Sequence, residues 1–124
     1  MLIAFVTSDL VFPSRLTAVS ARIGARMETV ASGPALLSKV KAAESGQTVV
    51  LFDLSTPEID AVETIAALKA LSPPPRAIIA FGPHVHEAKL AAAQAAGCDL
   101  VLSRGQFGAR ASAILEQYAA HSSD

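Results

Sequence analysis

Five short runs of apolar residues divide the chain and predict five β-strands. Four of the runs show no polar alternation, which is typical of strands buried on both faces of a parallel sheet. The remaining run, 27–31, mixes polar and apolar residues between two glycines, and this pattern favours an edge strand. The predicted strands are 2–7, 27–31, 48–52, 77–81 and 100–102.

Segments with helical periodicity alternate with these runs. Ser55 and Glu58 have the spacing of a capping box and predict the start of the third helix. Gly24 and Gly46 are predicted to end the first two helices. The predicted helices are 13–24, 34–46, 55–71, 86–97 and 107–120. Five strand–helix units in alternation predict an α/β fold with a doubly wound parallel sheet, formed as one domain over residues 1–124.

Composition narrows the classes of function. With 52% hydrophobic and 17% charged residues, the chain has the character of a well-buried domain. A net charge of −1 and 5% aromatic residues argue against nucleic-acid binding, and no apolar run is long enough to span a membrane. The single Cys98 has no thiol partner and is expected to be buried and inert. We therefore expect a cytoplasmic protein.

Chemistry in such a sheet is expected beyond the carboxyl ends of the strands, where ligands collect. Ser8 and Asp9 follow the first strand, Asp53 closes the third, and Ser103 and Arg104 follow the fifth. With strands one and three adjacent, Asp9 and Asp53 are predicted to share a cleft. Their repulsion would require a cation or a guanidinium nearby, or protonation of one carboxyl.

Three segments of the chain resemble parts of the receiver domains of two-component signalling, and the overall resemblance covers nearly the whole chain. They are Ser8-Asp9, the LFDLS stretch around Asp53, and the AAGCDLVLSRG stretch that leads into strand five. Asp9 also precedes Asp53 by 44 residues, about the family's spacing. The resemblance implies a flavodoxin-like (βα)5 fold with strand order 2-1-3-4-5. It also implies that Asp53 is the phosphoacceptor and that Asp9 and Asp53 are ligands of Mg²⁺.

Other positions of the family's site have changed here. Receivers usually carry a serine or threonine where this chain has Gly82, a lysine where it has Arg104, and a first acidic residue where it has Ser8. We assign Ser8, Gly82, Ser103 and Arg104 as phosphate-binding or switch positions. Asp53 is either a phosphoacceptor or a carboxylate paired permanently with Arg104. Asp9 is either a metal ligand or a side chain that accepts hydrogen bonds from the N–H groups of a turn or of a helix N-terminus.

His84 and His86 stand close together after the fourth strand. Residues two apart on a helix point to different sides, so we interpret both as solvated loop residues rather than metal ligands. A second interpretation is that either imidazole contacts a protein partner. Gly82 and Pro83 form too short a segment to identify a phosphate-binding loop.

The leading hypothesis is a stand-alone atypical receiver, or pseudo-receiver, that acts through protein contacts and is not an enzyme. Its expected partner is a histidine kinase or a downstream effector, and segments 86–97, 100–102 and 107–120 are the expected surface for a homodimer. The alternative is a small-molecule or nucleotide-binding domain that uses the same crevice, with Arg104 holding an anionic group. A hydrolase or lyase built on His84, Glu87 and Ser103 ranks last, because the sequence contains no nucleophile elbow or triad order.

Overall fold

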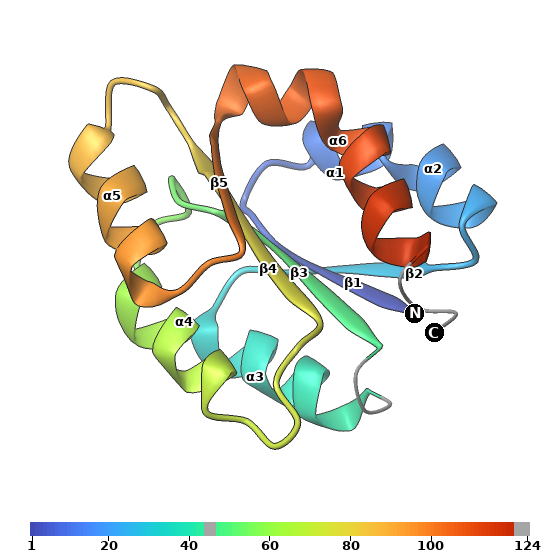
Figure 1. Ribbon diagram of the computed structural model, residues 1–124, viewed down its shortest axis with the longest axis horizontal. Coiled ribbons are helices and arrows are strands. Elements are labelled where there is room, and N and C mark those ends of the chain that lie inside the picture. The colour runs from blue at the N-terminus through green and yellow to red at the C-terminus, as the bar shows by residue number, and fades with distance from the viewer. Residues whose placement is uncertain (44–46, 121–124) are drawn as a thin grey trace.

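A parallel sheet with helices on both faces forms the protein in the computed structural model, which describes residues 1–43 and 47–120 (Figure 1). The strand order β2-β1-β3-β4-β5 confirms the predicted fold class. The strands are β1 (Leu2–Val6), β2 (Arg26–Val30), β3 (Thr48–Asp53), β4 (Ala77–Gly82) and β5 (Leu100–Ser103). The helices are α1 (Val11–Arg15), α2 (Thr17–Arg22), α3 (Gly33–Ala42), α4 (Ala61–Lys69), α5 (Glu87–Ala96) and α6 (Arg104–Ala120). No helix in the described part of the chain has both the length and the apolarity needed to cross a bilayer.

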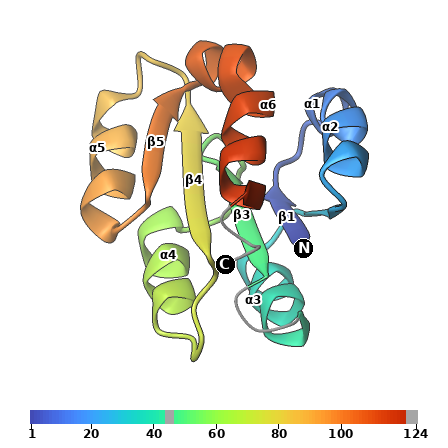
Figure 2. The same cartoon turned by 45° about the vertical axis from the view of Figure 1, so that its right-hand side comes forward.

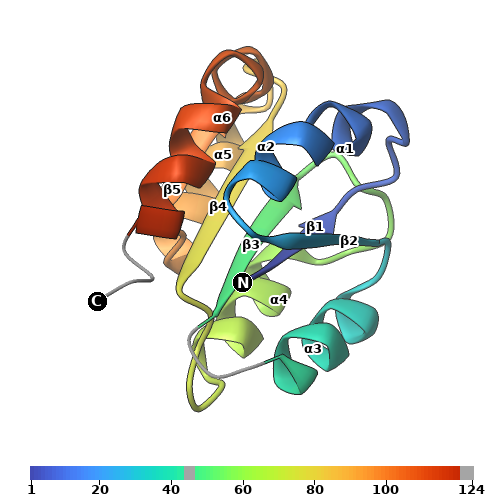
Figure 3. The same cartoon turned by 90° about the vertical axis from the view of Figure 1, so that its right-hand side faces the viewer.

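Two hydrophobic cores lie on opposite faces of the sheet. Successive strand residues point to opposite faces, so Ile3 and Phe5 join the core beneath α1, α2 and α6, whereas Ala4 and Val6 join the core beneath α3, α4 and α5. Figures 2 and 3 show these two helical layers from different sides. The continuous apolar pattern of the central strands therefore reflects burial on both faces.

The predicted start of the third helical segment is wrong. Ser55 donates its main-chain N–H and its hydroxyl to the Asp53 carboxylate, and Glu58 has a φ of 63°, outside the helical region. α4 begins later, where the Asp60 side chain accepts a hydrogen bond from the Glu63 N–H at 3.0 Å. Ser55 therefore hydrogen-bonds to the Asp53 carboxylate instead of capping a helix as the sequence pattern predicted.

The segment predicted as one helix over 13–24 forms two short helices, α1 and α2, and α1 begins before Pro13. Proline is tolerated there because N–H groups in a first helical turn have no partner within the helix. Gly24 follows α2 with a φ of 72°, which confirms the predicted stop. The stop predicted at Gly46 lies outside the described residues.

Candidate functional site

Asp53 closes β3 with a buried carboxylate that accepts three hydrogen bonds. The Thr7 hydroxyl donates to Oδ2 at 2.8 Å, and the Ser55 N–H and hydroxyl donate to Oδ1 at 3.0 and 2.6 Å. The residue is only 2% exposed. Because buried charge is costly without compensation, these uncharged donors are what keep the carboxylate in place.

Strand register explains why Thr7 occupies this position. β1 and β3 pair in parallel with Val6 opposite Phe52, so the next residue of each chain segment brings Thr7 beside Asp53. Thr7 also accepts a hydrogen bond from the Asp9 N–H at 3.0 Å. Thr7 was not among the predicted site residues. It is the last residue of the first apolar run, but only the strand register aligns it with Asp53, the residue that follows the third run.

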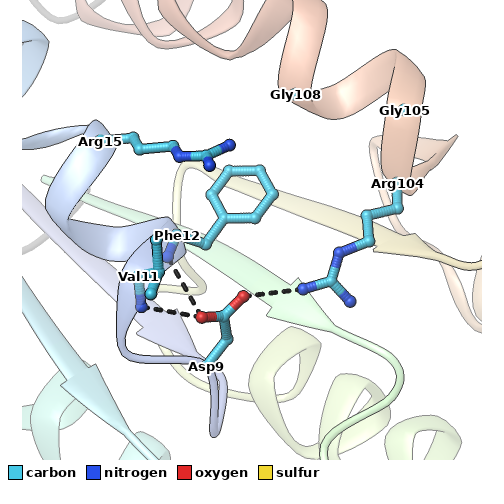
Figure 4. Close-up of a pocket in the computed structure, with 7 residues that line it drawn as sticks. All are labelled: Asp9, Val11, Phe12, Arg15, Arg104, Gly105 and Gly108. Atoms are coloured by element: carbon cyan, nitrogen blue, oxygen red, sulfur yellow. Dashed lines mark hydrogen bonds and ion pairs between the residues drawn. The ribbon is translucent and has the colours of Figure 1, made fainter.

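Asp9 is directed to α1 and α6 and has no hydrogen bond to Asp53. Its Oδ1 accepts hydrogen bonds from the N–H groups of Val11 and Phe12 at 2.8 and 3.3 Å. Its Oδ2 accepts a hydrogen bond from Arg104 Nη2 at 2.8 Å (Figure 4). The helix N–H groups, and then the guanidinium, hold the pKa of Asp9 below its usual value.

These contacts bear on one alternative in each of the two pairs of interpretations. The expectation that Asp9 is a ligand of a helix N-terminus is confirmed. The expectation that Arg104 pairs with Asp53 is wrong, because the Arg104 guanidinium forms its ion pair with Asp9. The two carboxylates therefore have different partners: hydroxyl donors surround Asp53, and an arginine lies beside Asp9.

A pocket of about 470 Å³ lies between α1 and α6, next to this ion pair. The Arg104 guanidinium carbon lies 5.9 Å from the centre of the Phe12 ring, and Figure 4 shows Arg15 approaching the same ring from α1. Phe12 is anchored below by contacts with Phe5, Phe81 and Phe107. The residues that line the pocket are Asp9, Val11, Phe12, Arg15, Arg104, Gly105 and Gly108.

Ser103 and Ser8 lie near the carboxyl ends of the strands, but neither donates a hydrogen bond to the Asp53 carboxylate, whose donors are Thr7 and Ser55. Ser103 and Gln106 form a reciprocal cap: the Ser103 N–H donates to the Gln106 side chain at 3.0 Å, and the Gln106 N–H donates to the Ser103 hydroxyl at 3.2 Å. This cap starts α6 earlier than the predicted segment 107–120, and the serine–glutamine spacing was the overlooked signal. The Ser8 side chain is exposed.

Gly82 ends β4 opposite Ser103, and its surroundings are filled. A Cβ atom at this position would lie 3.3 Å from Leu54 Cβ and 3.7 Å from a methyl group of Leu90. Packed leucine side chains thus occupy the space next to the expected switch position.

The histidines after β4 lie in an exposed turn, where the His86 N–H donates to the Pro83 carbonyl at 2.9 Å. Within residues 1–43 and 47–120, no three His, Cys, Asp or Glu side chains are grouped to hold a metal ion. Ser103 caps α6 and Glu87 is exposed in the first turn of α5, so the geometry gives no support to a hydrolase set with His84.

Cys98 lies in the core beneath α5, as expected for a structural thiol. Burial and the neighbouring Asp99 raise its pKa to about 11. A thiol that stays protonated at neutral pH is a poor nucleophile.

Comparison with solved structures identifies the fold. The receiver domain of a sensor histidine kinase from Pseudomonas aeruginosa, which holds a magnesium ion in its active-site cleft, is 19% identical with a TM-score of 0.76, over 96% of this chain and 97% of that one. A chemotaxis response regulator of Vibrio cholerae is 18% identical with a TM-score of 0.75, over 94% and 97%. The receiver domain of NtrX from Brucella abortus is 11% identical with a TM-score of 0.74, over 96% and 98%. No protein-family model and no curated protein sequence matches the chain. These likenesses establish the receiver fold.

Proposed function

We propose that this chain, which has the fold of a receiver domain, is a pseudo-receiver: a signalling module that acts through protein contacts without a phosphorylation cycle at Asp53. The observation that carries the proposal is the state of the Asp53 carboxylate. Both of its oxygens accept hydrogen bonds from Thr7 and Ser55, while Arg104, the cation expected to serve it, is bound to Asp9.

Charge balance supports this assignment. A phosphoryl group on Asp53 would add negative charge at a residue that is 2% exposed, and phosphoryl transfer depends on cations that offset such charge. The Arg104 guanidinium forms its ion pair with Asp9 rather than with Asp53, so the described contacts place no cation on the Asp53 carboxylate. The attacking oxygen would also have to give up its hydroxyl donor. Asp53 is still the residue to test, because it is the carboxylate at the end of β3.

Mg²⁺ is the cation to use in that test, since the Pseudomonas aeruginosa receiver domain holds it in its cleft. In this chain the ion would find the Asp53 carboxylate and the Thr7 hydroxyl, while Asp9 is committed to α1 and Arg104. Mg²⁺ prefers several oxygen ligands in octahedral geometry, and this donor set supplies one carboxylate. We therefore propose weak Mg²⁺ binding, in which the ion would supply positive charge beside Asp53.

Gly82 supports the same conclusion at the switch position. It carries no hydroxyl that could follow a phosphoryl group, and the contacts with Leu54 and Leu90 leave little room for one. A conformational signal through this residue would therefore need a rearranged core.

The proposed contact surface consists of α5, β5 and α6, together with the turn that carries His84 and His86. α5 exposes a series of small side chains: Ala88, Ala91, Ala92 and Ala95. The alanines of α5 are thus largely turned away from the sheet, since only Ala93 of this helix is buried. Small exposed residues allow the backbone of a partner helix to approach closely, so this surface suits a histidine kinase, an effector or a second copy of the chain.

Intact-mass spectrometry tests the state of Asp53. The protein is incubated with acetyl phosphate and Mg²⁺, beside the Asp53→Ala variant as the matched control. We expect no phosphoryl mass gain in either protein. A gain in the wild type that is absent from the variant would establish a phosphorylated receiver and overturn the proposal.

Sedimentation tests the contact surface. We expect self-association to weaken in Ala91→Glu, at an exposed position of α5, and to be unchanged in Ala21→Glu, at an exposed position of α2. A monomer at all concentrations would rule out the homodimer and leave a different protein as the partner.

A further inference from the structure

Two arginines from different helices line the pocket between α1 and α6. Arg104 uses one N–H donor for Asp9, and a guanidinium has five, so donors remain for a ligand. No hydrogen bond or ion pair of the Arg15 guanidinium is present among the described residues. Asp9 offsets one of the two positive charges, and its carboxylate oxygens already accept hydrogen bonds. The pocket therefore has an excess of positive charge and unused N–H donors.

Two glycines of α6 line the pocket, although packing within the protein does not require glycine at either position. A Cβ atom on Gly105 would meet nothing within 4 Å, and one on Gly108 would only touch the Phe12 ring at 4.0 Å. Alanine would fit at both positions and would stabilise the helix, because glycine is among the poorest helix formers. Both glycines line the same pocket as Arg15 and Arg104. A ligand held against the helix backbone would account for both.

The remaining walls are apolar and firmly placed. Phe12 is fixed by its ring contacts with Phe5, Phe81 and Phe107, and Val11 stands beside it, 59% exposed. A pocket of about 470 Å³ is within the size range of small-molecule sites and is larger than a lone anion needs. The ligand should therefore combine an anionic group with a small apolar body.

We propose that the pocket between α1 and α6 binds a small organic phosphate, whose phosphoryl oxygens are held by Arg15 and Arg104. A phosphate offers three acceptor oxygens and can serve two guanidinium groups together. The apolar part of the ligand lies along Val11 and Phe12, against the α6 backbone at Gly105 and Gly108. This site goes beyond the protein-contact function and does not depend on Asp53.

Titration with phenyl phosphate, followed by two-dimensional ¹H–¹⁵N NMR of the full chain, tests the proposal. We expect saturable shifts at the amides of Val11, Phe12, Gly105 and Gly108. Inorganic phosphate should bind more weakly because it lacks the apolar body, and phenol should not saturate because it lacks the charge. Benzoate that binds as tightly as phenyl phosphate would overturn the assignment to phosphates, and the absence of any saturable shift with phenyl phosphate would overturn the site.

Variants separate ligand binding from folding. Arg15→Gln should weaken phenyl phosphate binding about tenfold or more, the loss typical of one charged hydrogen bond. Arg110→Gln, an exposed arginine of α6 outside the pocket, is the matched control and should bind as the wild type. Gly108→Ala should raise the unfolding midpoint and still weaken binding, a pair of effects that damage to the fold cannot produce. Equal binding by the wild type, Arg15→Gln and Gly108→Ala would refute the proposal.

Discussion

Replacing Thr7 by valine tests the hydrogen bonds that hold Asp53. Thr7 and Thr56 form a natural pair for comparison, because each is 6% exposed and each donates its hydroxyl to Asp53. The Thr7 hydroxyl donates to the carboxylate at 2.8 Å, whereas the Thr56 hydroxyl donates to the main-chain carbonyl at 2.7 Å. Valine has nearly the shape of threonine and replaces the hydroxyl by a methyl group in both cases.

The two substitutions should differ in their effect on the free energy of unfolding. In Thr7→Val the buried Asp53 Oδ2 loses its donor, and a hydrogen bond to a charged group contributes about 1.5–3 kcal/mol. The Asp9 N–H also loses its acceptor, an uncharged hydrogen bond that contributes about 0.5–1.5 kcal/mol. In Thr56→Val the Asp53 carbonyl keeps the Thr56 N–H at 3.1 Å, so the loss should be about 0.5–1.5 kcal/mol. We therefore expect Thr7→Val to cost about 1–3 kcal/mol more than Thr56→Val.

Urea unfolding at pH 7 measures this difference. Both valine variants are made in the wild-type background and in the Asp53→Asn background. In the Asp53→Asn background, Thr7→Val should remove only uncharged hydrogen bonds and should therefore cost less than in the wild type. Thr7 and Asp53 should then be coupled in the double-mutant cycle. Equal costs for the two valine variants, or a cost for Thr7→Val that is the same in both backgrounds, would refute the view that the Thr7 hydroxyl stabilises an ionised Asp53.

Three other predictions concern Gly82, Asp9 and Cys98. Gly82→Ser should lower the free energy of unfolding by about 1–3 kcal/mol in urea, because its Cβ would lie 3.3 Å from Leu54 Cβ. The lowered pKa of Asp9 stabilises the fold above its unfolded pKa near 3.8, and this contribution is lost as the pH falls through the lower folded value. Asp9→Asn should therefore flatten the loss of stability below pH 4 in acid titrations followed by circular dichroism. The raised pKa of Cys98 favours the protonated thiol in the folded state, so stability should decrease between pH 9 and about 11, and the native thiol should react slowly with iodoacetamide at pH 8.

A specific result would contradict each of these three predictions. A Gly82→Ser variant as stable as the wild type would show that Leu54 moves without cost. If Asp9→Asn loses stability below pH 4 as steeply as the wild type, the contacts of Asp9 with α1 and Arg104 contribute nothing to folding. Alkylation of native Cys98 as fast as in urea would show that the thiol is accessible.

The strands were predictable because burial on both faces leaves an unambiguous pattern. The runs 48–52 and 77–81 were placed to within one residue at each end, and the partly polar run 27–31 was correctly taken as an edge strand. Helix starts were less predictable, because side chains with capping chemistry have several competing partners. Ser55 fits a capping box by spacing but binds Asp53, whereas Asp60 provides the actual cap of α4.

The sequence by itself determined the alternation of strands and helices and the placing of Asp53 at a strand end. Both follow from local properties, namely apolar periodicity and the position of a polar residue after an apolar run. The tertiary structure alone decided which partner each charged group received. Register brought Thr7 rather than Asp9 to Asp53, and the approach of α6 to α1 brought Arg104 to Asp9. Such pairings depend on ångström-scale distances between segments that are far apart in the chain, and spacing along the sequence does not encode those distances.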